Sequence, residues 1–588
     1  MITRLLTALL LVSGPAIGRA QSPDFRAMVR DALQKGAHRV VIPPGVYRLA
    51  PVEGQRVIWT VNGAKDAQIV ADGVTLIGTV LTRAVDFENC TDVTLQGLTV
   101  DYDPLPFTQG TIVSVGQDKN SVDVKIHAGY PVQPYSRIDV VDPATRYRKT
   151  GMPFLWGTTA VLVGSDVVRI TRSGVGKIAA PGDYMSMSTG PDPKWGIPHA
   201  MTVSDCAQMT FRNVTIHSAP GMGLIESGGA GGSQYLGCNV TLGPKPAGAT
   251  QDRLLTTSWD AMQSANIRKG PLVEGCVMED AGDDSWSVQS SDYLVVSHEG
   301  NSLTILPRDP YTSGLEIGDA IRRSIDSPEA VVVSRKAIPF SHAGLSADVL
   351  DKLKTASKWS FWDVGRNCLV LTLDRDFSAA VGDSIFSPDR QGAGFIFRNN
   401  KLHSTGRVLI KAGDGVIEGN LLDEAWGLVV NPELPFPAAA GISNLVIRDN
   451  VIRRSGFFCP APFLAQAGAI SVTASGPRGH VRPAGVYDGI VIENNKIIGA
   501  NGPNIVVSSA LNVRISGNDF IDAQRTPPND SGKNFGIAND CVVWVGASDH
   551  VRIAGNQITG IGPYVRKPVI IDPSAKDVTV SGLQTPGQ

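Results

Sequence analysis

The chain has 588 residues, in which 53 Lys and Arg residues are balanced by 55 Asp and Glu residues. This balance argues against a nucleic acid or an anionic membrane surface as the main partner, since both select for a basic excess. Hydrophobic residues make up 42% of the chain, which is enough for a buried core, while 63 glycines and 38 prolines predict that many turns interrupt it.

The first 20 residues have the pattern of a secretory signal peptide. An apolar run at 5–12 follows a single Arg, and the small residues Gly18 and Ala20 predict cleavage after Ala20. The run is too short to span a bilayer, and no later run of about 18 apolar residues follows it. We therefore expect an exported protein, periplasmic or secreted, without a membrane span.

Residues 21–107 are expected to hold an N-terminal cap and the first coils of a repeat. In "FRAMVRDALQKG", Phe25, Met28, Val29 and Leu33 fall on one face of a helix. An amphipathic helix at this place would cover the open end of a stack of repeats, as the ends of solenoids require.

A short frame recurs from "LQGLTVD" (95–101) to "IAGNQIT" (553–559): strand residues, a small residue or Asn, then a second strand. Neighbouring asparagines of this frame lie 20 or 23 residues apart where no loop intervenes, which is the period of a solenoid. Val and Ile favour β-strands, and Asn at a corner tolerates a left-handed backbone and can hydrogen-bond to its equivalents in adjacent coils. The sequence therefore predicts an all-β fold, a right-handed parallel β-helix. The aligned asparagines are Asn400, Asn420, Asn450, Asn495, Asn518 and Asn556.

Two stretches, 108–200 and 302–391, break this frame. Both contain alternating strand patterns and a Gly-Asp turn, as at Gly182-Asp183 and Gly382-Asp383. They are predicted to be small antiparallel β-barrels inserted between coils, the second with a short helix near 343–357. The segments 201–301 and 392–588 are then further coils of the β-helix.

Three aspartates within 201–301 form the strongest candidate site. Asp260 lies 23 residues before Asp283, which is one coil, and Asp284 follows directly. Strands of adjacent coils stack at about 4.8 Å, so the three carboxylates should cluster. Crowded like charges, with the apolar Trp259 and Trp286 nearby, raise the pKa of one member and supply an acid at neutral pH. Glycosidic hydrolysis needs such an acid and a second carboxylate. The alternatives are corner residues of the coil or calcium ligands.

Further residues are candidates for binding a sugar. Glu226 begins a glycine-rich loop, Arg407 and Lys411 share the stretch "GRVLIKAGDG", and Trp426 and Glu433 flank "GLVVNPELPFP". Trp stacks well on the apolar face of a sugar, although packing between coils is an equally good account of it. A solvated base is the alternative for Arg407 and Lys411. No stretch has metal-ligand or nucleotide-binding spacing, so we expect neither a metal nor a cofactor.

The seven cysteines include no Cys-x-x-Cys pair. Cys238 and Cys276 occupy the same position of the recurring frame. They are predicted to be small buried residues of the coil, because free cysteine is among the most often buried residue types.

The block "RLLTTSWDAMQSANIRKGPLVEGCVMEDAGDDSWSV" (253–288) resembles the core motif of glycoside hydrolase family 110, the exo-acting α-1,3-galactosidases. The stretches "DYDPLPFTQGTI" (101–112) and "GRVLIKAGDGVIEGN" (406–420) are similar to that family too, and a weaker similarity extends to the polygalacturonases of the same pectin-lyase-like superfamily. The resemblance implies inversion, with Asp260, Asp283 and Asp284 as catalytic residues. By the polygalacturonase arrangement, Asp283 is the general acid, and Asp260 and Asp284 orient the water. An inverting pair is expected about 6.5–9.5 Å apart.

Departures from these patterns affect the expected substrate. Ser258 and Trp259 stand where family 110 has Asn and Ala, and the Gly-His-Gly motif of polygalacturonases is missing around His298, which argues against a uronic acid. The expected function is an exported inverting hydrolase that releases terminal α-1,3-linked galactose from an oligosaccharide or polysaccharide. A polysaccharide lyase, a polygalacturonase-like hydrolase and a non-catalytic glycan-binding protein stay open, as does the oligomeric state, with a homodimer among the options.

Overall fold

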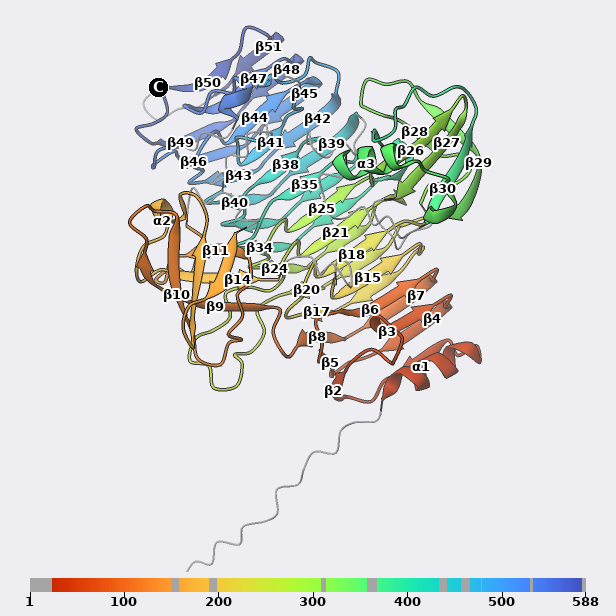
Figure 1. The fold of residues 1–588 in the computed structure, drawn as a ribbon. Helices are drawn as coiled ribbons and strands as arrows, with labels where there is room; N and C mark the ends of the chain where they lie inside the picture. Colours follow the sequence, from red (N-terminus) through yellow and green to blue (C-terminus); the bar gives the residue numbers. More distant parts are fainter. Residues whose placement is uncertain are drawn as a thin grey trace, which may run out of the picture.

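The computed structural model describes residues 24–149, 158–189, 198–307, 314–356, 367–432, 441–455, 466–476, 479–528 and 532–583. It confirms the predicted right-handed parallel β-helix with two antiparallel inserts (Figure 1). The predicted signal peptide and its cleavage site lie outside the described residues. Among the described residues, no helix is both long enough and apolar enough to cross a membrane.

Each coil contributes one strand to each of three parallel sheets, which we call sheets A, B and C in the order in which the chain meets them. The strands of the 13-stranded sheet A are β1 (Arg39–Val41), β4 (Lys65–Val70), β7 (Thr91–Gln96), β16 (Thr210–Arg212), β19 (Gln234–Leu236), β23 (Leu272–Glu274), β33 (Ile396–Arg398), β36 (Val416–Glu418), β39 (Ile442–Arg448), β42 (Tyr487–Glu493), β45 (Ala510–Ser516), β48 (Asp549–Ala554) and β51 (Lys576–Ser581).

Sheets B and C are both 12-stranded. The strands of sheet B are β2 (Gly45–Leu49), β5 (Val74–Gly78), β8 (Thr99–Tyr102), β17 (Thr215–Ile216), β20 (Asn239–Val240), β24 (Val277–Glu279), β34 (Lys401–His403), β37 (Leu421–Asp423), β40 (Val451–Arg453), β43 (Lys496–Ile498), β46 (Asp519–Ala523) and β49 (Gln557–Ile561). The strands of sheet C are β3 (Val57–Asn62), β6 (Arg83–Glu88), β15 (Met201–Ser204), β18 (Leu224–Ser227), β21 (Met262–Ala265), β25 (Trp286–Gln289), β35 (Val408–Ile410), β38 (Leu428–Val430), β41 (Ile470–Val472), β44 (Ile505–Ser508), β47 (Cys541–Gly546) and β50 (Lys567–Ile571). A two-stranded sheet of β22 (Ile267–Lys269) and β32 (Gln391–Ala393) lies beside sheet A.

The interior of the coil is filled by stacks of like side chains from successive coils. Parallel pairing places equivalent residues directly above one another, so that Phe211 stacks on Tyr235 with ring centroids 5.3 Å apart. Cys238 and Cys276 are buried within the same core, as predicted. Such stacks bury apolar area without a break along the axis, which is the main driving force for folding of a solenoid.

The aligned asparagines form a continuous ladder at the edge between sheets A and B. Asn400 Nδ2 donates to Asn420 Oδ1 at 3.0 Å, Asn420 Nδ2 donates to Asn450 Oδ1 at 2.9 Å, and the series runs on to Asn556. The predicted hydrogen bonds between coils are thus confirmed. The left-handed backbone lies one residue earlier than predicted, for example at Asn399 with φ of 57° and at Gly419 with φ of 65°.

The N-terminal helix α1 (Phe25–Gln34) caps the first coil, as predicted. Asp24 accepts a hydrogen bond from the N–H of Arg26 and so begins the helix. The Phe25 ring packs edge-on against Tyr47 and Trp59. Met28 is 40% exposed, so the buried face is narrower than the sequence pattern indicated.

The first insert leaves the coil after β8 of sheet B and returns at β15 of sheet C, so it emerges at the edge between these two sheets. Its six antiparallel strands enclose a core of their own, in the spatial order β11-β14-β9-β10-β13-β12. They are β9 (Phe107–Val115), β10 (Ser121–Ile126), β11 (Arg137–Val141), β12 (Thr159–Leu162), β13 (Val167–Thr171) and β14 (Tyr184–Ser188), with the short helix α2 (Val175–Ile178).

The second insert emerges from the end of sheet C and is a closed barrel. Its six strands have the order β28-β29-β30-β27-β26-β31, and a bridge between Arg322 and Phe386 joins the two outermost strands. They are β26 (Tyr293–Glu299), β27 (Ser302–Pro307), β28 (Ala320–Ile321), β29 (Ala330–Pro339), β30 (Asn367–Leu373) and β31 (Ser384–Ile385), followed by η2 (Pro388–Arg390). Helix α3 (Ala347–Ala356) lies where a helix was predicted, after η1 (Phe340–His342).

In Figure 1, strands β15 to β35 of sheet C lie between the first insert (orange) and the second (green). A further short helix, η4 (Lys533–Phe535), belongs to the last coils.

Candidate active site

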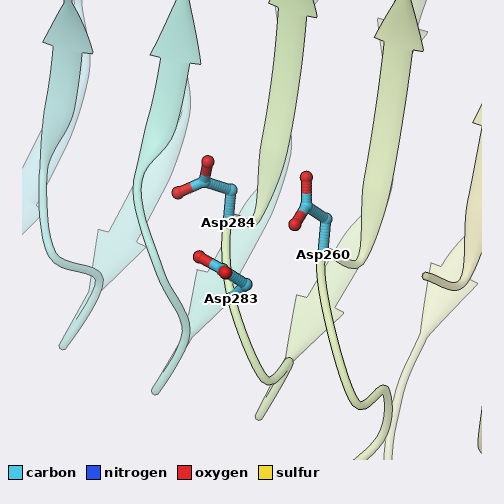
Figure 2. A group of neighbouring side chains, drawn as sticks. All are labelled: Asp260, Asp283 and Asp284. Atoms are coloured by element: carbon cyan, nitrogen blue, oxygen red, sulfur yellow. The ribbon is translucent and has the colours of Figure 1, made fainter. Parts of the chain in front are cut away.

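The three aspartates meet at the edge between sheets B and C. Asp260 lies just before β21, while Asp283 and Asp284 lie in the turn between β24 and β25. Strands β21 and β25 are adjacent parallel strands, and the N–H of Ala261 donates to the carbonyl of Asp284 at 2.9 Å. Figure 2 shows the three side chains extending to the same side from two neighbouring segments, and one oxygen from each carboxylate lies within 4.8 Å of the others. The structure thus brings together the carboxylates that the one-coil spacing predicted to cluster, while their chemical role stays a prediction.

The spacing of these oxygens is shorter than the separation expected for an inverting pair. Such a pair flanks the glycosidic bond at about 6.5–9.5 Å. Here the three carboxylates come from two stacked coils, whose strands lie about 4.8 Å apart. They therefore lie close together on the same side of the coil.

Two glycines allow the turn at 280–285 to lie against its neighbours. A Cβ on Gly282 would meet the carbonyl oxygen of Ser258 at 2.3 Å, and one on Gly406 would meet the carbonyl oxygen of Asp283 at 2.1 Å. The N–H of Gly406 donates to that same carbonyl at 2.9 Å. The N–H of Asp283 in turn donates to the carbonyl of Trp259 at 3.2 Å, so backbone bonds from both adjacent coils fix the turn.

Asp284 is paired with a cation from the next coil. Arg407 Nε donates to Asp284 Oδ1 at 2.7 Å, and both side chains are more than nine-tenths buried. Burial strengthens this attraction because the surrounding dielectric is low. The Arg407 guanidinium therefore stabilises the carboxylate form of Asp284.

Asp260 has the opposite electrostatic environment. Burial raises its pKa well above the ordinary value, the negative charges of Asp284 and Asp283 raise it further, and Arg407 opposes this only in part. Gln263 Nε2 approaches Asp260 Oδ2 at 3.3 Å. Asp283 is the most exposed of the three aspartates. The surroundings of the site therefore favour the protonated form of Asp260 and the charged form of Asp284, and they leave Asp283 more accessible.

The other predicted binding residues are distributed unevenly around this cluster. Arg407 belongs to it, as described above. Trp426 packs on Leu409 at the outer face of sheet C, one coil beyond Arg407. The Lys411 side chain is fully buried. Glu433 lies outside the described residues.

Glu226 lies inside the coil rather than beside the carboxylate cluster. It shares the inward orientation of Leu224, two residues earlier on β18, and is fully buried. Its carboxylate accepts hydrogen bonds from Ser233 Oγ at 2.5 Å and Tyr235 Oη at 3.0 Å. Burial raises its pKa to about 7. The predicted contact of Glu226 with a sugar is therefore corrected to a buried, structural role.

Sequence reasoning missed several polar neighbours of the site. Ser287 Oγ lies 3.5 Å from Asp260 Oδ2, and Gln263 bonds to the same oxygen. Both could have been found from alternation, since Gln263 and Ser287 are paired residues on the outer face of adjacent strands. Asp280, in the same turn as Asp283, has its pKa raised to about 7 by burial. The His199 ring packs edge-on against Trp259, and burial lowers the pKa of His199 well below the ordinary value, which favours the neutral ring.

The three carboxylates also form a set of oxygen donors of the kind that calcium takes. Arg407, however, occupies one oxygen of Asp284 and places a positive charge beside the set. This charge disfavours a cation there.

Comparison with models of protein families and with curated proteins gives no match. The solved structures that the chain resembles include the mannuronan C-5 epimerase AlgE6 A-module of Azotobacter vinelandii, with 11% identity, a TM-score of 0.36, and coverage of 96% of this chain and 94% of that one. The family 28 exopolygalacturonase of Yersinia enterocolitica has 10% identity, a TM-score of 0.39, and coverage of 94% and 75%. The GH87 α-1,3-glucanase catalytic unit of Streptomyces thermodiastaticus strain HF3-3 has 12% identity, a TM-score of 0.31, and coverage of 82% and 97%. These neighbours are an epimerase, an exopolygalacturonase and a glucanase, and at this level of similarity no conclusion about this chain is drawn from them.

Proposed function

We propose that the chain is a glycoside hydrolase whose chemistry is carried out by Asp260, Asp283 and Asp284. The observation that carries this proposal is the contrast inside one cluster: burial beside like charges favours the protonated form of Asp260, while the ion pair with Arg407 favours the charged form of Asp284. Two carboxyl groups with proton affinities driven apart by their surroundings are the usual mark of an acid and a base. Hydrolysis of a glycosidic bond requires that combination.

The proposed reaction moves one proton through the cluster. The proton of Asp260 passes by way of Asp283, the accessible member, to the glycosidic oxygen, and the bond between that oxygen and the anomeric carbon breaks. A water attacks the anomeric carbon and gives its proton to Asp284. The cluster then holds the same number of protons as before, and exchange with solvent restores their positions. This assigns the acid role to Asp283, as the resemblance implies, but makes Asp260 its proton source instead of a residue that orients the water.

Stereochemistry separates two versions of this hydrolase. The resemblance to family 110 implies inversion. Two hydrogen bonds of about 2.8 Å from one water span about 4.6 Å, so carboxylate oxygens within 4.8 Å of one another can hold an attacking water. The same short spacing lies near the value of about 5–5.5 Å that is typical of retaining enzymes, so retention is the second candidate.

The proposed substrate is a terminal α-1,3-linked galactose on an exported or extracellular glycan. The resemblance of 253–288 to family 110 supports the sugar and the linkage, and the signal-like segment 1–20 supports export. A lyase is less well supported, because it needs a free base: Arg407 is paired with Asp284, and Lys411 is fully buried.

A screen with chromogenic α- and β-glycosides tests the function, and proton NMR of the first product tests the stereochemistry. We expect hydrolysis of an α-galactoside with the β-anomer of galactose appearing first. The α-anomer appearing first would select retention. An unsaturated product that absorbs in the ultraviolet would select a lyase, and binding of glycans without any turnover would contradict the proposal.

A further inference from the structure

The first insert reaches across to the turn that carries Asp283. Arg137, at the start of β11, donates from Nη2 to the carbonyl oxygen of Gly282, and Arg148 donates from Nη2 to the carbonyl oxygen of Ala281. Both contacts join segments more than 130 residues apart in the sequence. They are possible because the insert leaves the coil at the edge between sheets B and C, where the turn itself lies.

A single carboxylate orients both arginines. Arg137 Nη1 donates to Asp139 Oδ2 at 2.5 Å, and Arg148 Nε lies 3.5 Å from Asp139 Oδ1. Arg137 and Asp139 are buried. A guanidinium is a planar fork of donors, so a carboxylate on one side of it fixes the direction of the remaining N–H groups. Asp139 thereby directs the guanidinium groups of Arg137 and Arg148 toward the 280–285 turn.

The two carbonyls that receive these bonds directly precede Asp283. Among the described residues, no backbone N–H donates to the carbonyl of Ala281 or Gly282. The adjacent coils hold the turn through other atoms: the N–H of Gly282, the N–H of Asp283 and the carbonyl of Asp283. The outer side of the turn is therefore fixed by the insert and not by the coil.

We propose that Arg137, Asp139 and Arg148 are positioning residues that hold the 280–285 turn so that Asp283 stays in register with Asp260 and Asp284. This inference rests on the proposed hydrolase function. The first insert is then part of the catalytic apparatus, acting through two peptide carbonyls and without touching the substrate. A carboxylate that is misplaced by about 1 Å can cost on the order of 100-fold in rate, so fixing the turn has a direct effect on turnover.

Variants of the insert test this inference. Arg137→Gln removes the guanidinium that donates to the carbonyl of Gly282. Arg148→Gln removes the guanidinium that donates to the carbonyl of Ala281 and leaves the Arg137–Asp139 pair intact. The matched control is Arg169→Gln, which breaks an exposed ion pair with Asp123 on the same insert. With an aryl glycoside that the wild type hydrolyses, we expect kcat to fall at least tenfold in the two turn variants, with KM within about threefold and Arg169→Gln unchanged.

Hydrogen–deuterium exchange reads out the turn independently of catalysis. Peptides that cover 281–285 should exchange faster in Arg137→Gln and Arg148→Gln than in the wild type and in Arg169→Gln, while core strands such as β25 stay protected. Arg137→Lys, which keeps the charge and one donor, should restore part of kcat and protection, and it serves where Arg137→Gln does not fold. Unchanged exchange at 281–285 in both folded turn variants, or a loss confined to KM, would overturn the inference. If the wild type hydrolyses no glycoside, the proposed function fails, and the exchange measurement alone still decides whether the insert holds the turn.

Discussion

Two edges of the same coil carry columns of stacked polar side chains, and they behave in opposite ways. At the edge between sheets A and B, asparagines such as Asn420 and Asn450 stack with each Nδ2 bonded to the next Oδ1. At the edge between sheets B and C, the stacked groups are the carboxylates of Asp260 and Asp284. An amide is both donor and acceptor, so a stack of amides satisfies itself, whereas ionised carboxylates only accept and repel one another. Stacking therefore gives structure at one edge and reactivity at the other.

Replacing the carboxylates by amides would make the second edge resemble the first, and this is the change with the largest expected effect. Asp260→Asn, Asp283→Asn and Asp284→Asn should each lower kcat about 10²–10⁴-fold, the usual size of general acid–base catalysis. Stability should stay equal or rise in Asp260→Asn and Asp283→Asn, because both changes relieve the crowding of acidic groups. Asp284→Asn should instead lower stability, because it breaks the buried ion pair with Arg407.

Leaving-group dependence separates the roles of these three residues. An activated aryl glycoside needs little protonation, so it should partly rescue Asp260→Asn and Asp283→Asn but not Asp284→Asn, which lacks the group that accepts the proton of the water. Turnover is measured against matched unactivated and activated substrates, and stability by thermal unfolding. Full activity in all three variants would remove the cluster from catalysis.

Arg407→Gln removes the cation that pairs with Asp284 at the edge between sheets B and C. Breaking a buried ion pair leaves an uncompensated charge and costs about 3–5 kcal/mol of stability. Arg407 also opposes the rise in the pKa of Asp260, so its loss should raise that pKa further. Ionisation of Asp284 should likewise need a higher pH, so both limbs of the pH–rate profile should move to higher pH. The control Arg398→Gln, which breaks a more exposed pair with Glu274, should leave the profile in place.

Asn450→Asp places a carboxylate among the stacked amides of the asparagine ladder. Asn450 Nδ2 donates to Asn495 Oδ1 and to the carbonyl of Ile417, so a carboxylate oxygen at that place would face two acceptors. At pH 8 we expect a loss of about 3–5 kcal/mol in the free energy of unfolding, as for other unpaired buried charges, and a smaller loss at pH 4. Urea unfolding at the two pH values measures it, with the exposed Asn367→Asp as control. A loss that is equal at both pH values would contradict the account of the ladder.

The sequence predicted the ladder and the clustering of the three aspartates because both depend on periodicity. Parallel coils stack residues one period apart, so counting alone matches Asn495 with Asn518. Counting also brings Asp260 to the pair Asp283 and Asp284, although the register aligns it with Asp284, 24 residues on. The same count leaves an error of one residue, which is why the left-handed position was assigned to the ladder asparagines instead of the residue before them.

The parts that could not be predicted depend on contacts with no periodic signal. Side chains of β18 alternate between the inside and the outside of the coil, and this alternation decides which way Glu226 points. Every residue of "LIES" is buried, so the burial of the strand does not distinguish its two faces. The bond from Arg137 to Gly282 joins an insert to a coil across 145 residues, and no local pattern marks either partner. Long-range docking of this kind has to be seen in three dimensions.

A single buried carboxylate away from both edges gives the smallest predicted effect and separates burial from stacking. Burial raises the pKa of Glu226 from 4.5 to about 7, so between these values the folded chain holds a proton that the unfolded chain has released. The stabilising contribution of this proton is complete below about pH 4.5 and is lost as pH rises through about 7, by about 3 kcal/mol at most. Glu226→Gln keeps an acceptor for Ser233 or Tyr235 and removes the titration. Relative to the wild type, the variant should therefore gain stability between pH 5 and pH 8 in urea unfolding, while the exposed Glu53→Gln gains none. A difference between Glu226→Gln and the wild type that does not change with pH would show that Glu226 does not carry this proton.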